Sequence, residues 1–142
     1  MRHPFQRRQA ALAILLSCTS MLSLADAWPA KPIRTIVPFP AGGGTDIVAR
    51  DVTQKMTATT KWTFVIDNKP GSGGNLGIDT AAKAPADGYN LVIGQTSNLA
   101  INPSLYSKLP YDPVKDLTPI GLIGNAPLVL VVAMDSPFKT LA

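Results

Sequence analysis

The chain has no glutamate, one histidine and one cysteine among its 142 residues. His3 and Cys18 both lie near the start, in a segment with the pattern of an export signal. If that segment is removed, the working protein has neither an imidazole nor a thiol. These absences exclude a cysteine or serine–histidine nucleophile, a zinc site of histidines and cysteines, and an internal disulfide. The apolar content of 46% is nevertheless typical of a folded protein, which excludes wholesale disorder.

Residues 1–27 have the features of a secretory signal peptide in the right order. Three arginines precede an apolar run that begins over 10–16, and Ala-Asp-Ala at 25–27 is a small-x-small cleavage site. The apolar run is shorter than the roughly 20 residues that a permanent membrane anchor needs. A buried helix and a lipoprotein signal at Cys18 are the alternatives, and a bulky leucine two positions before the cysteine fits the second poorly. The segment therefore predicts export to the periplasm and a mature protein that starts at Trp28.

The charge of the mature part gives no support for a nucleic-acid partner. Without the three N-terminal arginines and Asp26, 10 basic and 8 acidic residues remain, a net charge of +2. The two signs are interspersed, and there is no cluster of lysines or arginines of the kind that a nucleic-acid interface needs. We therefore expect no nucleic acid among the partners.

The mature part alternates short β-rich runs with helix-like stretches. Strands are predicted over 33–37, 63–67, 89–94, 120–123 and 128–133, and helices over about 45–57, over 75–84 and, shorter, near 97–106. This alternation is typical of an α/β fold, with a parallel sheet covered by helices. Ser136-Pro137 is a good helix start, and we expect a helix that begins there to be cut off by the end of the chain.

Two glycine-rich loops hold seven of the 11 glycines. They cover residues 38–46 and 70–77, and each lies between a predicted strand and a predicted helix. In a parallel α/β sheet both loops open at the carboxyl edge of the strands, where ligands bind. Glycines let backbone N–H groups approach a ligand, and the helix that follows adds its free N–H groups and the positive end of its dipole. The pattern predicts an anion site built mainly from main chain; tight turns without a ligand are the alternative.

A nucleotide phosphate is a poor candidate for this anion. The sequence has no Gly-Lys dipeptide, so the phosphate-binding loop of NTPases is absent. Gly71, Gly73 and Gly77 are one residue out of step with the dinucleotide fingerprint, and there is no glutamate for a Walker-type or kinase-type carboxylate. We therefore expect no nucleotide cofactor, and the sequence indicates no other cofactor and no metal.

Two polar groups near this edge each have two interpretations. Asp46, at the start of a predicted helix, either interacts with the helix dipole or holds an ammonium or hydroxyl group of a ligand. Residues 95–98 (Gln-Thr-Ser-Asn) follow the third predicted strand and either bind a ligand or form a turn that caps the next helix. Trp62, Tyr106 and Tyr111 could stack on a ligand, but core packing is favoured for each.

Six stretches of the mature chain, in this order, resemble the Bug family, the extracytoplasmic solute-binding receptors of tripartite tricarboxylate transporters. The stretches are 28–34 (WPAKPIR), 37–50 (VPFPAGGGTDIVAR), 68–77 (NKPGSGGNLG), 85–89 (PADGY), 102–106 (NPSLY) and 109–116 (LPYDPVKD). The resemblance extends over nearly all of residues 28–142. No single stretch is diagnostic, and the evidence lies in their order and spacing.

The resemblance implies the fold of a type II periplasmic binding protein, in which two α/β lobes clasp a ligand between them. Residues 28–134 would form the N-terminal part of the first lobe, with a parallel-dominated sheet flanked by helices. Residues 135–142 would start the second lobe. We expect the rest of the second lobe to be missing and the chain to be truncated.

The resemblance also implies a non-enzymatic, periplasmic receptor. Such a receptor captures a small carboxylate, either an amino acid or a di- or tricarboxylate, and delivers it to the membrane permease subunits of the transporter. No catalytic residue, metal or cofactor is implied. Carried over position by position, the ligand-binding residues are Phe39, Ala41, Gly42, Gly43, Asp46, Gly74, Asn75, Thr96, Ser97 and Asn98.

Two other functions stay open at this point. An α/β enzyme would use Asp46 as a general base, but the sequence shows no second titratable group beside it to complete acid–base chemistry. A truncated gene remnant without activity is the other possibility.

Overall fold

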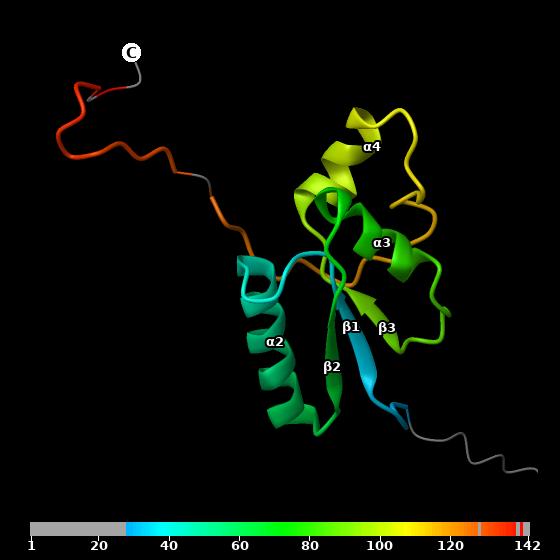
Figure 1. The fold of residues 1–142 in the computed structure, drawn as a ribbon. Helices are drawn as coiled ribbons and strands as arrows, with labels where there is room; N and C mark the ends of the chain where they lie inside the picture. The colour runs from blue at the N-terminus through cyan, green and yellow to red at the C-terminus, as the bar shows by residue number, and fades with distance from the viewer. Residues whose placement is uncertain (1–27, 128, 139, 141–142) are drawn as a thin grey trace, which may run out of the picture.

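A parallel sheet of three strands, in the order β2-β1-β3, lies at the centre of the fold (Figure 1). The computed structural model describes residues 28–127, 129–138 and 140. The strands are β1 (Ile33–Val37), β2 (Phe64–Asn68) and β3 (Asn90–Val92). β1 runs parallel to both neighbours, and its Ile33, Ile36 and Val37 are at most 1% exposed. The run of β-branched residues predicted as a strand is therefore the buried centre of the sheet.

The helix α2 (Gly44–Thr60) covers one face of this sheet and packs against β1 and β2. Ala49 and Thr53 lie four residues apart, so they share a side of the helix, and both are buried. The helix ends at Lys61, whose backbone is left-handed with φ of 64° and whose N–H donates to the Thr57 carbonyl at 2.9 Å. The sequence predicted this helix and its start, while its end lies three residues beyond the predicted one.

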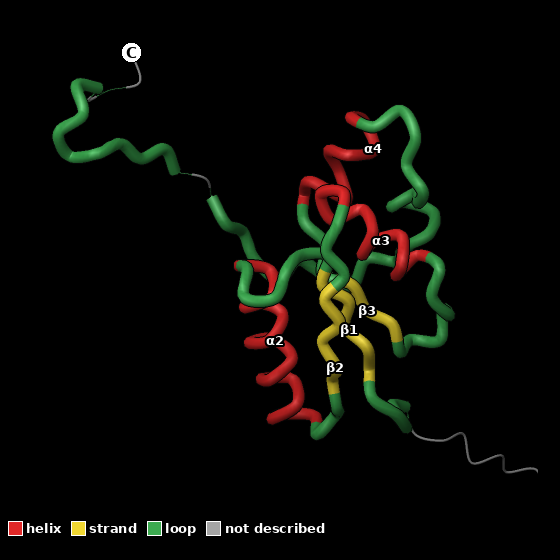
Figure 2. Tube along the Cα trace, viewed as in Figure 1, coloured by secondary structure: helices red, strands yellow, loops and turns green. Residues whose placement is uncertain are grey.

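The helix α3 (Asn75–Ala82) packs against β1 and β3 and lies on the opposite side of the sheet from α2, which gives three layers (Figure 2). A 3₁₀ turn over Ser72–Gly74 leads into it. α3 comes very close to the chain that leaves β1, because a Cβ on Gly77 would lie 2.6 Å from Pro38 Cα. Only glycine allows this approach, and it brings the start of α3 next to the loop after β1.

Beyond β3 the chain forms a π-helical turn over Ser97–Ile101 and the short helix α4 (Asn102–Leu105). Both lie within the stretch where a short helix was predicted. Tyr111, further along, packs back into the structure and is 5% exposed. The core-packing interpretation of Tyr111 is therefore confirmed.

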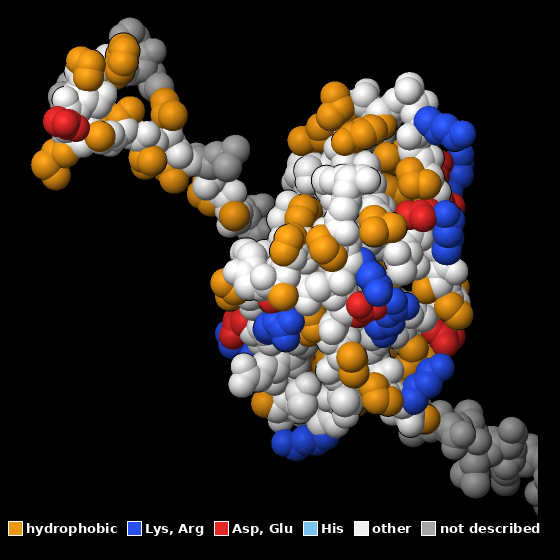
Figure 3. Space-filling model, viewed as in Figure 1, with side chains coloured by type: hydrophobic (Ala, Val, Ile, Leu, Met, Phe, Trp, Pro, Cys, Tyr) orange, Lys and Arg blue, Asp and Glu red, His pale blue; other side chains and the backbone are white. Residues whose placement is uncertain are grey.

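The strands predicted over 120–123 and 128–133 are wrong as far as the structure describes these residues. Positions 120–123 and 129–133 contain no strand, and Leu128 lies outside the described residues. Ile120 is 84% exposed and Val131 82% exposed. A strand forms only where a neighbouring edge accepts its hydrogen bonds. Within the described residues neither segment pairs with the sheet, and residues 129–133 lie on an arm that projects from the body (Figure 3).

Two other predictions fall wholly or partly on residues that the structure leaves undescribed. The signal peptide over 1–27 lies outside the described residues. At the predicted helix start, Phe138 N–H donates to Ser136 Oγ at 3.2 Å, and residues 139 and 141–142 are not described. Of the helices in the described ranges, none has the length and apolar character to cross a membrane.

Candidate functional site

Three loops meet at the carboxyl edge of the sheet, where β1, β2 and β3 end (Figure 1). Gly74, in the second loop, lies at the meeting point. A Cβ at Gly74 would lie 3.1 Å from Cζ of Phe39 in the first loop and 2.6 Å from Nδ2 of Asn98 in the segment after β3. The predicted convergence of the glycine loops and the segment after β3 is therefore present in the structure.

The first loop is bonded to the start of α2 through Asp46. The Asp46 carboxylate is 2% exposed and accepts three hydrogen bonds. Its Oδ2 accepts from the Gly42 N–H at 2.8 Å and from Arg50 Nε at 2.8 Å. Its Oδ1 accepts from Asn68 Nδ2 at 2.9 Å. Asp46 thus connects the loop, its own helix and the end of β2.

Asn68 completes this network at the end of β2. Its Nδ2 also donates to the Phe39 carbonyl at 3.1 Å, and its Oδ1 accepts from an Arg50 guanidinium N–H at 3.3 Å. The hydrogen bonds from Arg50, Gly42 and Asn68 hold the pKa of the Asp46 carboxyl far below its usual range. Asp46 is therefore ionised at neutral pH, and its charge is compensated locally.

These contacts limit what Asp46 can do chemically. A general base works best when its pKa lies near the working pH, and the pKa of Asp46 is far too low for this. Its buried oxygens already accept bonds from neighbouring groups. The structure also shows no group of three or more histidines, cysteines or acidic residues able to hold a metal within the ranges that it describes.

A second network of buried polar groups holds the other two loops together. The Tyr111 hydroxyl lies 2.8 Å from Asn75 Oδ1 and 2.7 Å from the Asn98 carbonyl. Asn102 Nδ2 donates to the same Asn75 oxygen at 2.6 Å. Burial raises the pKa of the Tyr111 hydroxyl, so it stays protonated and can donate at neutral pH. The start of α3 is thereby fixed against the helical turns that follow β3.

Asn98 leaves one donor unused at the point where the loops meet. Its Oδ1 accepts from the Gln95 N–H at 2.9 Å, which fixes the orientation of the amide. Its Nδ2 is buried, has no hydrogen-bond partner and faces Gly74. Gln95 Nε2 in turn donates to Thr45 Oγ1 at 2.5 Å, which ties the third loop to the start of α2. The turn interpretation and the ligand interpretation of 95–98 are therefore compatible.

The predicted site residues differ in how far solvent reaches them. Ala41, Gly42 and Thr96 are exposed, Phe39, Gly43 and Ser97 are half-buried, and Asp46, Gly74, Asn75 and Asn98 are buried. The accessible members are main-chain groups of the first loop and the hydroxyl segment of the third. The role of all ten in binding a ligand stays a prediction.

Sequence reasoning missed four side chains that hold these loops: Arg50, Asn68, Asn102 and Tyr111. Arg50 follows Asp46 by four residues, the spacing of a helical ion pair, so it could have been found. Asn68 lies 22 residues from Asp46 along the chain, and nothing local in the sequence indicates the contact.

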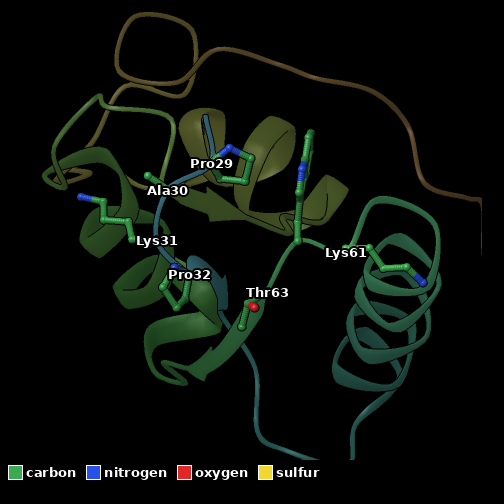
Figure 4. A pocket seen from close by; sticks show the side chains of 7 residues that line it. Pro29, Ala30, Lys31, Pro32, Lys61 and Thr63 are labelled. Atoms are coloured by element: carbon green, nitrogen blue, oxygen red, sulfur yellow. The ribbon is translucent and has the colours of Figure 1, made fainter. Parts of the chain in front are cut away.

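A cavity of about 170 Å³ lies at the opposite edge of the sheet, near the amino ends of β1 and β2 (Figure 4). It is lined by Pro29, Ala30, Lys31, Pro32, Lys61, Trp62 and Thr63. The two lysine amines point away from the cavity, toward Asp87 at 3.2 Å and the Ala58 carbonyl at 2.9 Å. Since no charge points into it, this cavity is no candidate for binding an anion.

Comparison with known proteins gives relatives of one kind. The model of the tripartite tricarboxylate transporter receptor family matches residues 48–142. The protein BugT of Bordetella pertussis is 44% identical over 108 residues, which are 75% of this chain and 33% of BugT. A protein encoded in the tcbD–tcbE intergenic region of a Pseudomonas species is 39% identical over 138 residues, 95% of this chain and 41% of the relative. The chain thus spans well under half the length of these relatives.

Solved structures of similar proteins have the same fold in the aligned part. MatC of Rhodopseudomonas palustris, solved with bound malate, aligns with a TM-score of 0.64 and 38% identity over 68% of this chain and 33% of its own. Rpa4515 of R. palustris, solved with adipate, aligns with a TM-score of 0.58 and 39% identity over 61% and 29% of the two chains. The periplasmic binding protein BugD aligns with a TM-score of 0.60 and 38% identity over 63% and 29%.

The family model covers more than half of the chain, and the solved relatives have the α/β fold of periplasmic binding proteins. The resemblance stated from the sequence motifs is confirmed at the level of family and fold. The chain belongs to the tripartite tricarboxylate transporter receptor family.

Proposed function

We propose that this protein is an extracytoplasmic solute-binding receptor that captures a small carboxylate and delivers it to the membrane permease of a tripartite transporter. The observation that carries the proposal is the carboxyl edge of the sheet, where three loops rich in N–H donors meet and where Asp46 is shielded. The malate of MatC and the adipate of Rpa4515 support a dicarboxylate as the kind of ligand.

The charges around this edge favour an anion. Residues 38–45, 69–78 and 93–106 contain no acidic residue. Lys69 directly follows β2, where its Nζ pairs with Asp67 Oδ1 at 3.4 Å. The starts of α2 and α3 point the positive ends of two helix dipoles toward the edge. The one carboxylate of the first loop and the start of α2, Asp46, is buried and paired with Arg50. A ligand carboxylate would therefore meet donors and partial positive charge without an exposed acidic side chain in these loops.

We further propose that residues 28–134 form the N-terminal part of the first lobe and that residues 135–142 start the second. Residues 1–27 act as a signal peptide that directs the protein to the periplasm, as expected for relatives of BugD. In such a receptor a second wall covers the other side of the ligand. Useful affinity needs most of a small ligand's surface to be buried. For residues 28–142 alone we expect millimolar affinity or weaker, roughly 4 kcal/mol.

The binding role is favoured over an enzyme with Asp46 as its general base. The low pKa of the Asp46 carboxyl and its burial oppose proton abstraction. Incubation with malate, followed by analysis of the solution, separates the two functions. A receptor returns malate unchanged, whereas an enzyme yields a product.

Titration of the ¹⁵N-labelled chain with malate, followed by NMR, tests the proposal. The amides of residues 41–44, 74–75 and 96–98 should shift, and malate's neutral diamide should leave them in place because it lacks the charges. Shifts confined to other parts of the chain, or equal shifts with the diamide, would contradict the proposal.

The variant Gly43→Val sharpens this test. Gly43 has φ of −75°, which valine can adopt, and a Cβ there would lie 3.3 Å from the Pro40 carbonyl. The fold should survive, while the added side chain occupies the space where the carboxylate would meet the loop N–H groups. The amide shifts caused by malate should therefore disappear. Gly121→Val is the matched control, because Gly121 has no atoms within 4 Å of its added Cβ and lies outside the three loops. It should bind like the wild type.

A further inference from the structure

We propose that Asp46, Arg50 and Asn68 are positioning residues that hold the first glycine loop in its ligand-binding shape. We call these three residues the loop clasp. The inference rests on the proposed function, since it concerns the loop that would bind the carboxylate. It assigns the three side chains a role behind the site and removes Asp46 from contact with the ligand.

The geometry of the loop clasp joins the first loop, α2 and the end of β2, and its contacts with Asn68 bridge 18 to 29 residues of sequence. Asp46 and Arg50 lie on α2, Asn68 ends β2, and their bonds reach the loop at two points. Asn68 Nδ2 donates to the Phe39 carbonyl at 3.1 Å, and the Gly42 N–H donates to Asp46 at 2.8 Å. The loop between these two points is thus tied at both ends to a strand and a helix of the core.

Burial separates this role from direct contact with a ligand. The Asp46 side chain is 2% exposed, whereas that of Arg50 is 54% exposed. A ligand ammonium would have to displace Arg50 and remove the carboxylate from two further donors to reach Asp46. The interpretation of Asp46 as a contact for a ligand ammonium is therefore disfavoured, and residues 38–45 of the loop offer a ligand no charged side chain.

The bonds also separate this role from ordinary helix capping. Gly43 is the N-cap of α2 and makes no side-chain cap, which makes Asp46 the third helical residue. In a capping box the side chain at this position returns to the N–H of the N-cap residue. The Asp46 carboxylate instead reaches one residue further, to Gly42, which lies outside the helix and has φ of 81°. The bond therefore fixes loop shape.

A loop with three glycines in succession needs such support to bind tightly. Glycine loses more conformational freedom than any other residue when it is ordered. If the ligand had to order the loop before α2 itself, this entropy would be subtracted from its affinity. A loop already held in shape avoids most of that cost. Weakening the loop clasp should therefore lower affinity for malate through the loop, without removal of any group that touches malate.

The variants Asp46→Asn and Asp51→Asn test this on one helix. Both remove a carboxylate from an i,i+4 ion pair of α2, but Asp51 pairs with Lys55 on the exposed side and does not reach the loop. Asp46→Asn should weaken malate binding by about 10-fold, equal to about 1.4 kcal/mol. It should also speed hydrogen exchange of the Gly42 amide. Asp51→Asn should leave both measurements at the wild-type level.

Asn68→Ala gives a second, independent perturbation in case Asp46→Asn does not fold. Alone it should weaken binding and speed Gly42 exchange in the same way. Combined with Asp46→Asn, it should add little, because both variants release the same loop. Additive losses of affinity would overturn the proposal, since they would indicate two separate contacts with malate.

The outcomes distinguish this inference from the proposed function. If the wild type shows no malate shifts at all, the proposed function fails, and the positioning role fails with it. If the wild type binds malate and Asp46→Asn binds it equally well despite fast exchange at Gly42, only the positioning role is wrong. Slow Gly42 exchange in Asp46→Asn would show that the carboxylate does not hold the loop, and would also overturn the inference.

Discussion

Asp46 carries a negative charge in a place that is almost closed to water. Arg50 and the N–H groups of Gly42 and Asn68 compensate that charge in place of water. This arrangement lowers the pKa of the carboxyl because each of these bonds stabilises the ionised form. At the scale of the residue, the loop geometry is therefore coupled to the protonation of one side chain. Protonation of Asp46 would remove its pairing with Arg50.

The coupling predicts how acid affects the stability of the fold. The pKa of Asp46 is lower in the folded state than the value of about 3.9 expected in the unfolded chain. Below that value the unfolded chain binds more protons, so the stabilisation is present at neutral pH and is lost as the pH falls through the folded pKa. Asp46→Asn should thus be less stable than the wild type at neutral pH, with a difference that shrinks steadily below about pH 4.

Denaturant unfolding of both proteins over a series of pH values measures this difference. Asp67, Asp87 and Asp112 also have lowered pKa values, so both proteins should lose stability in acid. Their contribution cancels in the comparison, because the two proteins share them. A difference between wild type and variant that stays constant with pH would contradict the role of the Asp46 charge.

The sequence predicted Asp46 as part of the site but not its surroundings. Its position at the start of a helix after a glycine loop is visible in the printed residues. Its partner Asn68 is not, because that contact depends on the register in which β2 lies beside β1. The same holds for Tyr111, which is 36 residues from Asn75 and was correctly predicted as buried but not as a hydrogen-bond donor.

At the scale of the elements, two glycines occupy helices for opposite reasons. Gly77 lies in α3 against the loop after β1, and a Cβ there would lie 2.6 Å from Pro38 Cα. Gly44 starts α2, and a Cβ there would have no neighbour within 4 Å. Packing between elements requires the first glycine. The second is not required by packing, and an alanine in its place would make α2 more stable.

The substitution of alanine at these two positions should therefore have opposite effects. Gly77→Ala should destabilise the protein by about 1–3 kcal/mol, because α3 must move away from Pro38. Gly44→Ala should stabilise it by about 0.4–1 kcal/mol, because alanine restricts the unfolded chain and fits the helix. Thermal unfolding followed by circular dichroism measures both. Destabilisation by Gly44→Ala would indicate that its backbone serves another purpose, and a neutral Gly77→Ala would show that α3 can shift freely.

Prediction of the elements from the sequence succeeded where local pattern and packing agree. The predicted bounds of β1 match the observed Ile33–Val37, and α2, β2, α3 and β3 were each found to within a few residues. The predicted strands over 120–123 and 128–133 have the apolar, β-branched composition of strands. They fail because a strand also needs a partner edge, and composition does not say whether one is present.

At the scale of the whole molecule, the segment 117–134 exposes many large apolar side chains, and its part beyond residue 128 lies on an arm that projects from the body (Figure 3). It contains no charged residue. Leu122, Val129, Leu130 and Val131 are each at least 78% exposed. Such a segment, with high β-propensity and without charge, is a typical site of association between chains.

We expect residues 28–142 to self-associate through this segment in solution. The contact should bury the exposed valines and leucines of two chains against each other, which removes apolar surface from water. Val131→Lys places a charge among the exposed apolar residues 129–133 of the segment, where burial would be costly, and should shift the protein toward the monomer. Sedimentation velocity over a range of protein concentrations measures the change.

Leu105→Lys is the matched control, because Leu105 is a 70% exposed apolar side chain on α4, outside the segment. It adds the same charge and should leave association unchanged. A wild type that is monomeric at every concentration, or equal effects of the two lysines, would contradict a role for this segment.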